Sequence, residues 1–330
     1  MRAVRLHGVR DLRLEEIPKP PPPGPGEVTL RVGMAGICGS DLHNYATGAW
    51  ISRTPSVAGH ELTGMVTALG AGVRHVRARQ RVIVDSRHGC GTCPACTEGN
   101  PHVCAHLGFL GEVIDGGFAQ FVNLPARNVL PAPEGVPDRH LVLAEPLAVA
   151  LHALGLLAAP AGARIIITGC GPIGAFSALL ATVQGHPVTV IDRNATRAAL
   201  VAKATGAEIV ALDDLGALRF RHALDTTGSA PVIRALLARI AGASRLALVG
   251  IAAPAEIIDP VYLVEHEIAL LGCHAFADEL PRIAGMLAGL GPQLDRLVAT
   301  PIPLAEVPAA YEALLAGRAK GVKTLMDCQK

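Results

Sequence analysis

The chain has 330 residues, which exceeds the size at which one hydrophobic core usually stops growing, so we expect two domains. Its formal net charge of +1 excludes the strongly basic surface that a nucleic acid or an acidic membrane would require, and a small-molecule partner is expected instead. Charged residues, proline and glycine interrupt the most apolar region, at about 147–183, so the composition also argues against a membrane span.

The N-terminal region has the pattern of a β-rich domain. It opens at Met1 with an alternating, strand-like pattern and without the apolar core of a signal peptide, which predicts a cytoplasmic protein. Short alternating runs such as 28–32 and 81–84 are separated by glycine and proline, and this predicts a partly open barrel within a domain of residues 1–146. The proline-rich stretch 18–26 could be a ligand for a recognition domain, but a stiff surface connection is favoured because extended strands flank it closely.

Potential metal ligands occur in two groups before residue 146. The first group is Cys38, His60, Glu61 and Glu145, which offers a thiol, an imidazole and two carboxyl groups. Any one of them alone is more often an ordinary core residue than a ligand. Consecutive strand residues face opposite sides, so His60 and Glu61 can reach one ion only if the backbone turns beside them, and Gly59 makes that turn easier.

The second group is a run of four cysteines, Cys90, Cys93, Cys96 and Cys104. Glycine and proline between them let the chain curl around a tetrahedral ion, and in a reducing compartment such a cluster holds zinc more often than it forms disulfides. We therefore predict a closed structural zinc site in a lobe at about 88–106. A redox dithiol is the weaker alternative, because that motif normally has two thiols and opens a helix.

After Glu145 the apolar period changes from two to between three and four. An apolar helix at 147–157 is followed by alternating strands and helices, which predicts a parallel sheet with crossover helices in a domain of residues 147–276. The expected strands are 165–168, 188–191, 209–210, 223–225, 246–249 and 268–271, and the expected helices are 173–184, 195–205 and 231–241.

Two parts of this second region are irregular. Only about eleven residues connect the strands that end at 210 and begin at 223, near the minimum for a parallel connection, so a single turn or an irregular loop is predicted there. The tail, residues 277–330, mixes helix and strand, ends with a strand at 322–326, and is expected to rejoin the first domain.

A glycine-rich dinucleotide fingerprint follows the first strand of the expected parallel sheet. Gly169 permits a tight turn, Gly171 the close approach of a phosphate, and Gly174 the packing of the next helix on the strand. Pro172 and Ile173 open that helix, whose free N–H groups and dipole would receive a pyrophosphate. The strand–turn–helix context makes this otherwise weak motif a strong one.

Cofactor choice is expected to depend on the end of the next strand. Asp192 would accept hydrogen bonds from the adenosine ribose and repel a 2′-phosphate, which favours NAD over NADP. Arg193 directly after it is a complication, because an arginine at this place can accept that phosphate. Val249, at the end of a later strand, completes the expected cofactor site.

Four segments together resemble the zinc-dependent medium-chain dehydrogenases, particularly their polyol (sorbitol-like), butanediol and threonine branch. They are Gly-Ile-Cys-Gly-Ser-Asp-Leu-His at 36–43, Gly-His-Glu at 59–61, the four-cysteine lobe and Glu-Pro-Leu at 145–147. The resemblance covers essentially the whole chain. It implies an α/β protein with an N-terminal GroES-like β-rich barrel domain and a Rossmann domain built on a doubly wound parallel sheet.

The resemblance also implies two zinc ions per chain, one catalytic and one structural, together with NAD. Cys38 and His60 would bind the catalytic zinc, while Glu61 would supply a third ligand or step aside for Glu145. An ion held in this way keeps a position open for water or substrate.

A proton relay and an oligomeric state are further implications of the resemblance. Ser40 and His43 would carry the proton away from the alcohol, although a turn hydroxyl and a surface histidine are the ordinary alternatives. A homodimer or homotetramer is expected. The edge strand near 270–271 is the candidate contact between subunits.

The reaction implied by the resemblance is hydride transfer from a secondary alcohol, polyol or sugar-derived, to NAD, giving a ketone. A threonine-like amino-alcohol or a butanediol dehydrogenase is the alternative within the family. A non-catalytic NAD-binding regulator is more remote, because the intact ligand set argues against it. The chain departs from the polyol branch at Gly272–Phe276, where Ala275 replaces an expected arginine, and in the link 211–222, which is shorter than family members usually have. The first departure leaves room for another alcohol or a hydroxy acid.

Overall fold

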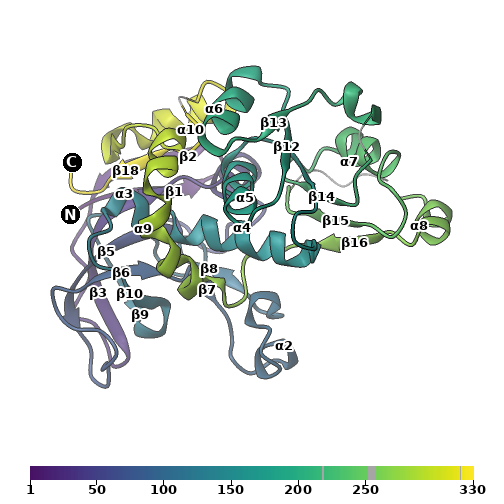
Figure 1. Cartoon of the computed structure of the whole chain (residues 1–330). Coiled ribbons are helices and arrows are strands. Elements are labelled where there is room, and N and C mark those ends of the chain that lie inside the picture. Colours follow the sequence, from purple (N-terminus) through teal and green to yellow (C-terminus); the bar gives the residue numbers. More distant parts are fainter. Residues whose placement is uncertain (218, 252–257, 320) are drawn as a thin grey trace. The chain divides into compact units, whose positions relative to one another are not determined.

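The computed structural model describes residues 1–217, 219–251, 258–319 and 321–330, whose elements are labelled in Figure 1. The described chain divides into two compact units. Unit 1 comprises Met1–Glu145, Leu280–Gly291 and Val298–Lys330, and unit 2 comprises Pro146–Glu279 and Pro292–Leu297. The end of the tail therefore groups with the N-terminal region, whereas the short segment 292–297 groups with unit 2.

Unit 1 is built on two main sheets. In the larger one, β3 (Glu27–Gly36) pairs antiparallel with β5 (Glu61–Leu69), β9 (Phe121–Pro125) and β18 (Leu325–Asp327). Its other strands are β6 (Arg81–Val84), β10 (Val129–Pro131) and β17 (Ile302–Pro303). The smaller sheet has the order β2 (Asp11–Glu16), β1 (Arg2–Gly8) and β4 (Ser56–Val57). The expected β-rich domain is thus present, and apolar residues of β3 and β5 such as Leu30 and Leu62 are buried in its core.

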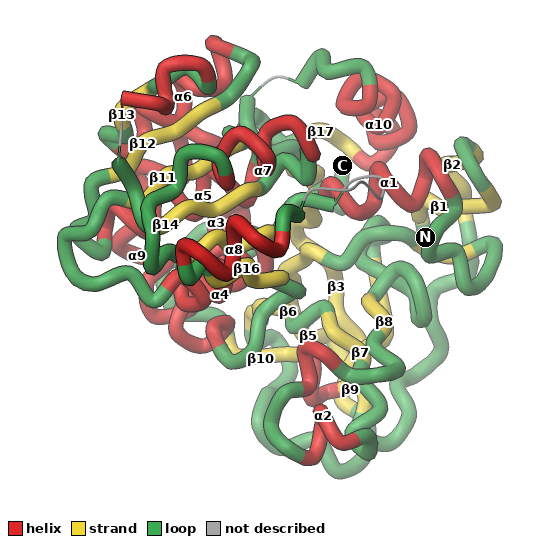
Figure 2. The backbone as a smooth tube through the Cα atoms, turned by 90° about the vertical axis from the view of Figure 1, so that its right-hand side faces the viewer, coloured by secondary structure: helices red, strands yellow, loops and turns green. Residues whose placement is uncertain are grey.

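Short helices and a lobe complete unit 1. The helices are α1 (Gly39–Thr47), α3 (Asp138–Leu141), α10 (Val307–Leu315) and residues 280–291 of α9 (Glu279–Leu297), with single 3₁₀ turns at η2 (Ala126–Asn128) and η4 (Leu304–Glu306). The lobe contains β7 (Arg87–His88), α2 (Pro94–Thr97), η1 (Pro101–Val103) and β8 (Gly108–Phe109). Strands β7 and β8 pair antiparallel at its base. Figures 1 and 2 both show α2 at the margin of this unit.

Unit 2 contains a six-stranded parallel sheet in the order β13-β12-β11-β14-β15-β16. The strands are β11 (Ile165–Thr168), β12 (Val188–Ile191), β13 (Glu208–Ile209), β14 (His222–Asp225), β15 (Arg245–Leu248) and β16 (Ala269–Gly272). Counted along the chain from β11, the order is 3-2-1-4-5-6, which is the doubly wound arrangement of dinucleotide-binding sheets. Figure 2 shows β12, β11 and β14 side by side. Strands β11 and β12 are buried along their whole length, as expected for a parallel sheet covered on both faces.

Helix α4 precedes the first of these strands in sequence, and the other helices of unit 2 lie between strands. The helices are α4 (Ala144–Leu157, from Pro146 on), α5 (Pro172–Val183), α6 (Ala195–Thr205), α7 (Ala230–Leu237) and α8 (Pro260–His266). The predicted strands and helices of this region are confirmed, with ends displaced by a few residues. The short link before β14 forms the 3₁₀ turn η3 (Asp213–Ala217), which confirms the prediction of a turn or irregular loop.

One stretch, Asp138–Leu157, is long and apolar enough by composition to cross a membrane. Within the fold, 78% of its most apolar window is buried. This burial is the property of a core helix, whose apolar surface is already covered by the protein itself.

Candidate active site

Cys38 lies at the junction between the central strand of unit 1 and a helix. Strand β3 ends at Gly36, and Cys38 is the N-cap residue of α1, with extended backbone angles. The Cys38 backbone N–H donates to Oδ2 of Asp41 at 2.8 Å. Asp41 therefore holds the loop, and the thiol is presented at the start of the helix.

His60 and Glu61 follow a backbone turn at the start of β5. Gly59 has a φ of +92°, a conformation that residues with a side chain rarely adopt. A Cβ at Gly59 would lie 2.1 Å from the ring of Phe118, so only glycine fits there. The predicted turn is present, and both following side chains are buried, with His60 5% and Glu61 0% exposed.

The turn brings three potential ligands together. One ligand atom each from Cys38, His60 and Glu61 lies within 4.8 Å of the others. A thiol, an imidazole and a carboxylate are the donor types that zinc prefers. Nδ1 of His60 is buried without a well-formed hydrogen bond among the described residues, although Oδ1 of Asp41 lies 3.2 Å away. The residues therefore fit a divalent zinc ion.

The pKa of His60 reflects the charges around it. Burial lowers this pKa, but the negative charges of Asp41 and Cys38 outweigh burial and raise it well above its ordinary value. A site that attracts a proton this strongly also attracts a metal cation, because the same negative groups stabilise either.

Glu145 is not in the group of three ligand atoms. Its carboxylate is 5% exposed and accepts a hydrogen bond from the Ser86 hydroxyl at 2.8 Å. Burial raises its pKa to about 7, the His60 charge opposes this and Glu61 adds to it. Glu145 is thus close enough to interact electrostatically with both residues, but its hydrogen-bond partner in this structure is Ser86. Sequence reasoning missed Ser86.

Lys323 is a second residue that sequence reasoning missed. Its ammonium group is buried, forms an ion pair with Glu61, and donates to the backbone oxygen of Ile37 at 2.8 Å. Burial lowers the pKa of Lys323, but the Glu61 and Cys38 charges raise it above its ordinary value. No local sequence pattern predicts the contact of this lysine with Glu61, because the two residues are 262 positions apart.

Ser40 and His43, the expected relay pair, lie three residues apart on α1 and so share one face of that helix. Both side chains are partly exposed. The His43 ring lies 4.9 Å from that of Trp50, centroid to centroid. Ser40 and His43 lie within about one turn of Cys38, the N-cap residue of the same helix.

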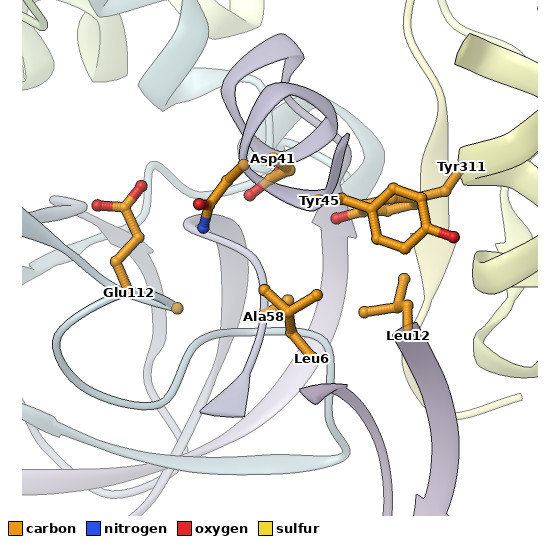
Figure 3. A pocket seen from close by; sticks show the side chains of 9 residues that line it. Leu6, Leu12, Asp41, Tyr45, Ala58, Glu112 and Tyr311 are labelled. Carbon is orange, nitrogen blue, oxygen red and sulfur yellow. The ribbon is translucent and has the colours of Figure 1, made fainter. Parts of the chain in front are cut away.

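A small cavity of about 10 Å³ lies beside α1, with room for roughly one water molecule. Figure 3 shows Asp41 and Tyr45 above Leu6 and Ala58, with Tyr311 beside Tyr45. The rings of Tyr45 and Tyr311 are 5.3 Å apart in a T-shaped contact.

Glu112 borders the same cavity from the turn after β8. Its carboxylate accepts a backbone hydrogen bond from Phe109 and forms no ion pair within the described part of the chain. Burial raises its pKa, while the His60 charge lowers it. A half-buried carboxylate near His60 without an ion-pair partner among the described residues is a candidate group for contacting a substrate. Neither a motif nor a spacing in the sequence indicates it.

The four cysteines of the lobe converge as predicted. Their sulfur atoms all lie within 4.8 Å of one another, with Cys104 Sγ 3.5 Å from Cys90 Sγ and 3.7 Å from Cys93 Sγ. Four sulfurs at about 2.3 Å from a tetrahedral zinc ion would be about 3.8 Å apart, whereas a disulfide requires about 2.05 Å. All four cysteines are free thiols, and their arrangement fits a metal rather than a disulfide.

Backbone N–H groups surround these sulfurs. Thr92 and Cys93 donate to Cys90 Sγ at 3.5 and 3.4 Å, and they lower the pKa of Cys90 to about 5. His106 donates to Cys104 Sγ at 3.3 Å. Such donors stabilise thiolates, the form that binds zinc.

Two glycines of the fingerprint, Gly169 and Gly174, are required by the fold of unit 2, whereas the backbone at Gly171 has open space beside it. Gly169 has a φ of +89°, and Gly171 is the N-cap residue of α5. A Cβ at Gly174 would lie 1.8 Å from the Gly169 backbone oxygen, so the helix approaches the strand as closely as predicted. Pro172 and Ile173 form the first turn of α5. Val249 follows β15, where its N–H donates to the Asp225 backbone oxygen at 2.9 Å.

Asp192 lies directly after β12, at the carboxyl end of the sheet. Its side chain is 2% exposed, and Arg197 forms an ion pair with it at 3.0 Å. Burial raises its pKa, but the Arg197 hydrogen bond and the N–H groups of Asn194 and Cys170 lower it below the ordinary value. Arg193, which the sequence marked as a complication, is exposed, and Arg197 rather than Arg193 pairs with the carboxylate.

Comparison with known proteins supports one family. Residues 24–134 match the alcohol dehydrogenase GroES-like domain. The chain is 28% identical to the sorbitol dehydrogenase of Bacillus subtilis over 99% of this chain and 97% of that protein. It is 30% identical to the 2-dehydro-3-deoxy-L-galactonate 5-dehydrogenase of Pseudoalteromonas atlantica over 93% of each. The alcohol dehydrogenase RspB of Escherichia coli CFT073, solved with NADH, has a TM-score of 0.91 and 28% identity over 99% of both chains.

A GroES-like unit and a doubly wound sheet with a dinucleotide fingerprint define a nicotinamide-dependent alcohol oxidoreductase. The chain belongs to the zinc-dependent medium-chain alcohol dehydrogenases. The family and the fold class predicted from the sequence are therefore confirmed, as is the enzyme class. Small-molecule alcohols are the substrates of this class.

Proposed function

We propose that the chain oxidises a polyol or sugar-derived secondary alcohol to a ketone, with NAD as the hydride acceptor. The observation that carries this proposal is the group of half-buried Cys38 with buried His60 and Glu61, whose ligand atoms lie within 4.8 Å of one another. In a chain of this family that also has the dinucleotide fingerprint, such a donor set would bind the zinc ion that activates the alcohol for hydride transfer.

Cys38, His60 and one of the two carboxylates, Glu61 or Glu145, would hold the catalytic zinc. When bound, this ion acts as a Lewis acid that lowers the pKa of an alcohol, and NAD accepts the hydride. Ser40 would accept the proton of the alcohol, and His43, which is partly exposed, would pass it to solvent. Residues 1–146 and 277–330 would form the catalytic domain, and 147–276 the cofactor domain.

The second zinc would be structural, held by Cys90, Cys93, Cys96 and Cys104. Because all four positions would be filled by thiolates, this site closes the lobe and takes no part in the reaction. The proposal is therefore two zinc ions per chain.

NAD is proposed over NADP because Asp192 is an ionised carboxylate at the end of β12. Gly169, Gly171, Pro172, Ile173 and Gly174 would receive the pyrophosphate at the start of α5. Arg193 and Val249 would border the bound dinucleotide.

A cytoplasmic homodimer or homotetramer is the proposed form of the enzyme, without a nucleic acid or membrane partner. Strand β16 is at one edge of the parallel sheet. Val261 and Val264 of the neighbouring helix α8 are 62% and 77% exposed. An open strand edge beside exposed valines supports pairing with a second copy.

A second candidate substrate class is an amino alcohol. Glu112 favours it, because a carboxylate near His60 with no ion-pair partner among the described residues would attract an ammonium group and repel a carboxylate. The same charge makes a hydroxy acid the least favoured substrate.

The test combines metal analysis with an alcohol panel. Purified protein should contain two zinc ions per chain, and neutral polyols should give the largest rise in NADH absorbance. A content well below two, or no oxidation of any neutral or amino alcohol, would refute the proposal. A best rate with an amino alcohol would select the second candidate.

A further inference from the structure

Lys323 and Glu61 form a fully buried ion pair beside the candidate catalytic metal site. Each side chain is 1% exposed. The Nζ atom of Lys323 also donates to the Ile37 backbone oxygen at 2.8 Å, so two acceptors hold the ammonium group in place. A buried ion pair by itself adds little to stability, because desolvation of both charges offsets their attraction. Stability alone therefore does not explain why this ion pair lies beside the candidate metal site.

The backbone of unit 1 provides a specific space for this pair. In the larger sheet, Gly36 of β3 lies opposite Glu61 of β5 on one side and Leu325 of β18 on the other. A Cβ at Gly36 would lie 2.3 Å from Oε2 of Glu61 and 3.1 Å from Cε of Lys323. The missing side chain at Gly36 thus leaves the room that the carboxylate and the lysine occupy.

Negative groups dominate the surroundings of Cys38 and His60. Asp41, Glu61 and Glu145 are carboxyl groups there, and a Cys38 thiolate would add a further negative charge to which a zinc ion would bring two positive ones. Lys323 is the ion-pair partner of Glu61 among the described residues. Without the Lys323 charge, the buried Glu61 carboxylate would be balanced by the metal alone and would bind it more tightly.

We propose that Lys323 is a positioning residue that holds the Glu61 carboxylate beside the metal and makes it a displaceable ligand. This proposal rests on the proposed catalytic zinc site. Cys38 and His60 would be the permanent protein ligands, and Glu61, held by Lys323, could give up its place to substrate or to the nearby Glu145. Lys323 touches neither substrate nor cofactor and acts only through Glu61.

The first test is zinc release from the holoenzyme to a chromophoric chelator. Cys38→Ser and Cys104→Ser variants assign the two phases of release to the catalytic and the structural ion. In Lys323→Met, release from the catalytic site should slow by about tenfold or more, because a Glu61 carboxylate freed from the ammonium group binds the ion more tightly, while the structural phase stays the same. Faster or unchanged catalytic release would overturn the proposal, because loss of a merely structural ion pair would loosen the site.

The second test is turnover with the best alcohol. Lys323→Met should lower kcat by at least about tenfold, since Glu61 then occupies the free position. The double variant Glu61→Gln/Lys323→Met has a neutral pair and should regain most of this loss. Lys323→Arg keeps the charge and should release zinc as the parent does. Lys330→Met, a change of an exposed lysine in the same tail, is the matched control.

Two further variants distinguish failure of the Lys323 proposal from failure to fold and from failure of the proposed function. If Lys323→Met does not fold, Glu61→Gln decides: retention of both zinc ions supports a displaceable Glu61, and loss of the catalytic ion overturns it. If the parent and Cys38→Ser contain the same amount of zinc, the proposed function fails independently of Lys323.

Discussion

Arg197 holds both carboxylate oxygens of Asp192, with its Nε 3.0 Å from Oδ2 and its Nη2 3.0 Å from Oδ1. The backbone N–H groups of Cys170 and Asn194 donate to the same two oxygens at 2.6 and 2.7 Å. The carboxylate is thus fixed at the end of β12, and its charge is partly balanced by a guanidinium group that could also face a phosphate.

Asp192→Ser should weaken the preference for NAD. Removal of the carboxylate leaves Arg197 and Arg193 free to attract a 2′-phosphate, so the ratio of kcat/KM for NAD to that for NADP should fall by about tenfold or more, equivalent to about 1.4 kcal/mol. Asp213→Ser, at an exposed aspartate of η3, is the control. Steady-state kinetics with both dinucleotides measure the ratio, and an unchanged ratio would count against Asp192 as the selecting residue.

Ser40→Ala should lower kcat by roughly 100-fold, in the range of a lost proton-transfer group. Ser40→Thr retains a hydroxyl and should recover most of the rate. Thr67→Ala, which removes an exposed hydroxyl on β5, serves as the control. Rates followed at the NADH absorbance check this, and a Ser40→Ala enzyme as fast as the parent would exclude the hydroxyl from the relay.

Much of the site could be predicted because its signals are local. The cysteines of the lobe are close in sequence, and Gly169 and Gly174 mark a turn that only glycine can form. Gly59 likewise revealed the turn that brings His60 and Glu61 together. The alternation of strands and helices was enough to predict the parallel sheet, although not the last residue of each element.

The remaining parts depend on contacts between distant segments. Lys323 reaches Glu61 only because β18 pairs with β3, and antiparallel pairing across nearly the whole chain leaves no periodic mark in the sequence. Glu112 is placed by an irregular turn after β8. The pairing of Asp192 with Arg197 instead of Arg193 depends on side-chain direction at the start of α6, which neighbouring positions in a sequence do not reveal.

Glu112→Gln should change which substrates are accepted. Loss of the negative charge near His60 should raise kcat/KM for a hydroxy acid, relative to a neutral polyol, by about tenfold. Glu134→Gln, at an exposed glutamate of the same unit, should leave the ratio as it is. Competition kinetics between one polyol and its acid analogue give the ratio directly. No change in Glu112→Gln would show that this carboxylate does not face the substrate.

Cys104→Ser should remove the structural zinc. Cys104 is 7% exposed and lies close to both Cys90 and Cys93, so a hydroxyl there cannot complete the tetrahedron. We expect a loss of one zinc ion per chain and a fall in Tm of about 5 °C or more, since 1 kcal/mol corresponds to roughly 2–4 °C at this domain size. Cys273→Ser, at a cysteine outside the lobe, should keep both ions. A Cys104→Ser protein that still holds two ions would contradict the lobe as a metal site.

Glu279 should make the stability of unit 2 depend on pH. Its Oε1 lies 2.8 Å from Nδ1 of His152, and its Oε2 accepts the Ala277 N–H at 2.6 Å. Burial raises the pKa of Glu279, but these hydrogen bonds and the His152 charge lower it below its ordinary value of 4.5. A carboxylate with a lowered folded-state pKa stabilises the fold above its unfolded pKa, and this stabilisation is lost as the pH falls through the folded value.

Glu279→Gln should therefore lower Tm at neutral pH and lose this difference in acid. The gap in Tm between parent and variant should be constant above pH 4.5, begin to close as the pH drops through that value, and vanish below the folded pKa of Glu279. Glu265→Gln, at an exposed glutamate of α8, should follow the parent at every pH. Calorimetric scans across this range measure the gap. A gap that widens in acid would have the wrong sign for a lowered carboxyl pKa and would show that the His152 contact does not stabilise the ionised form.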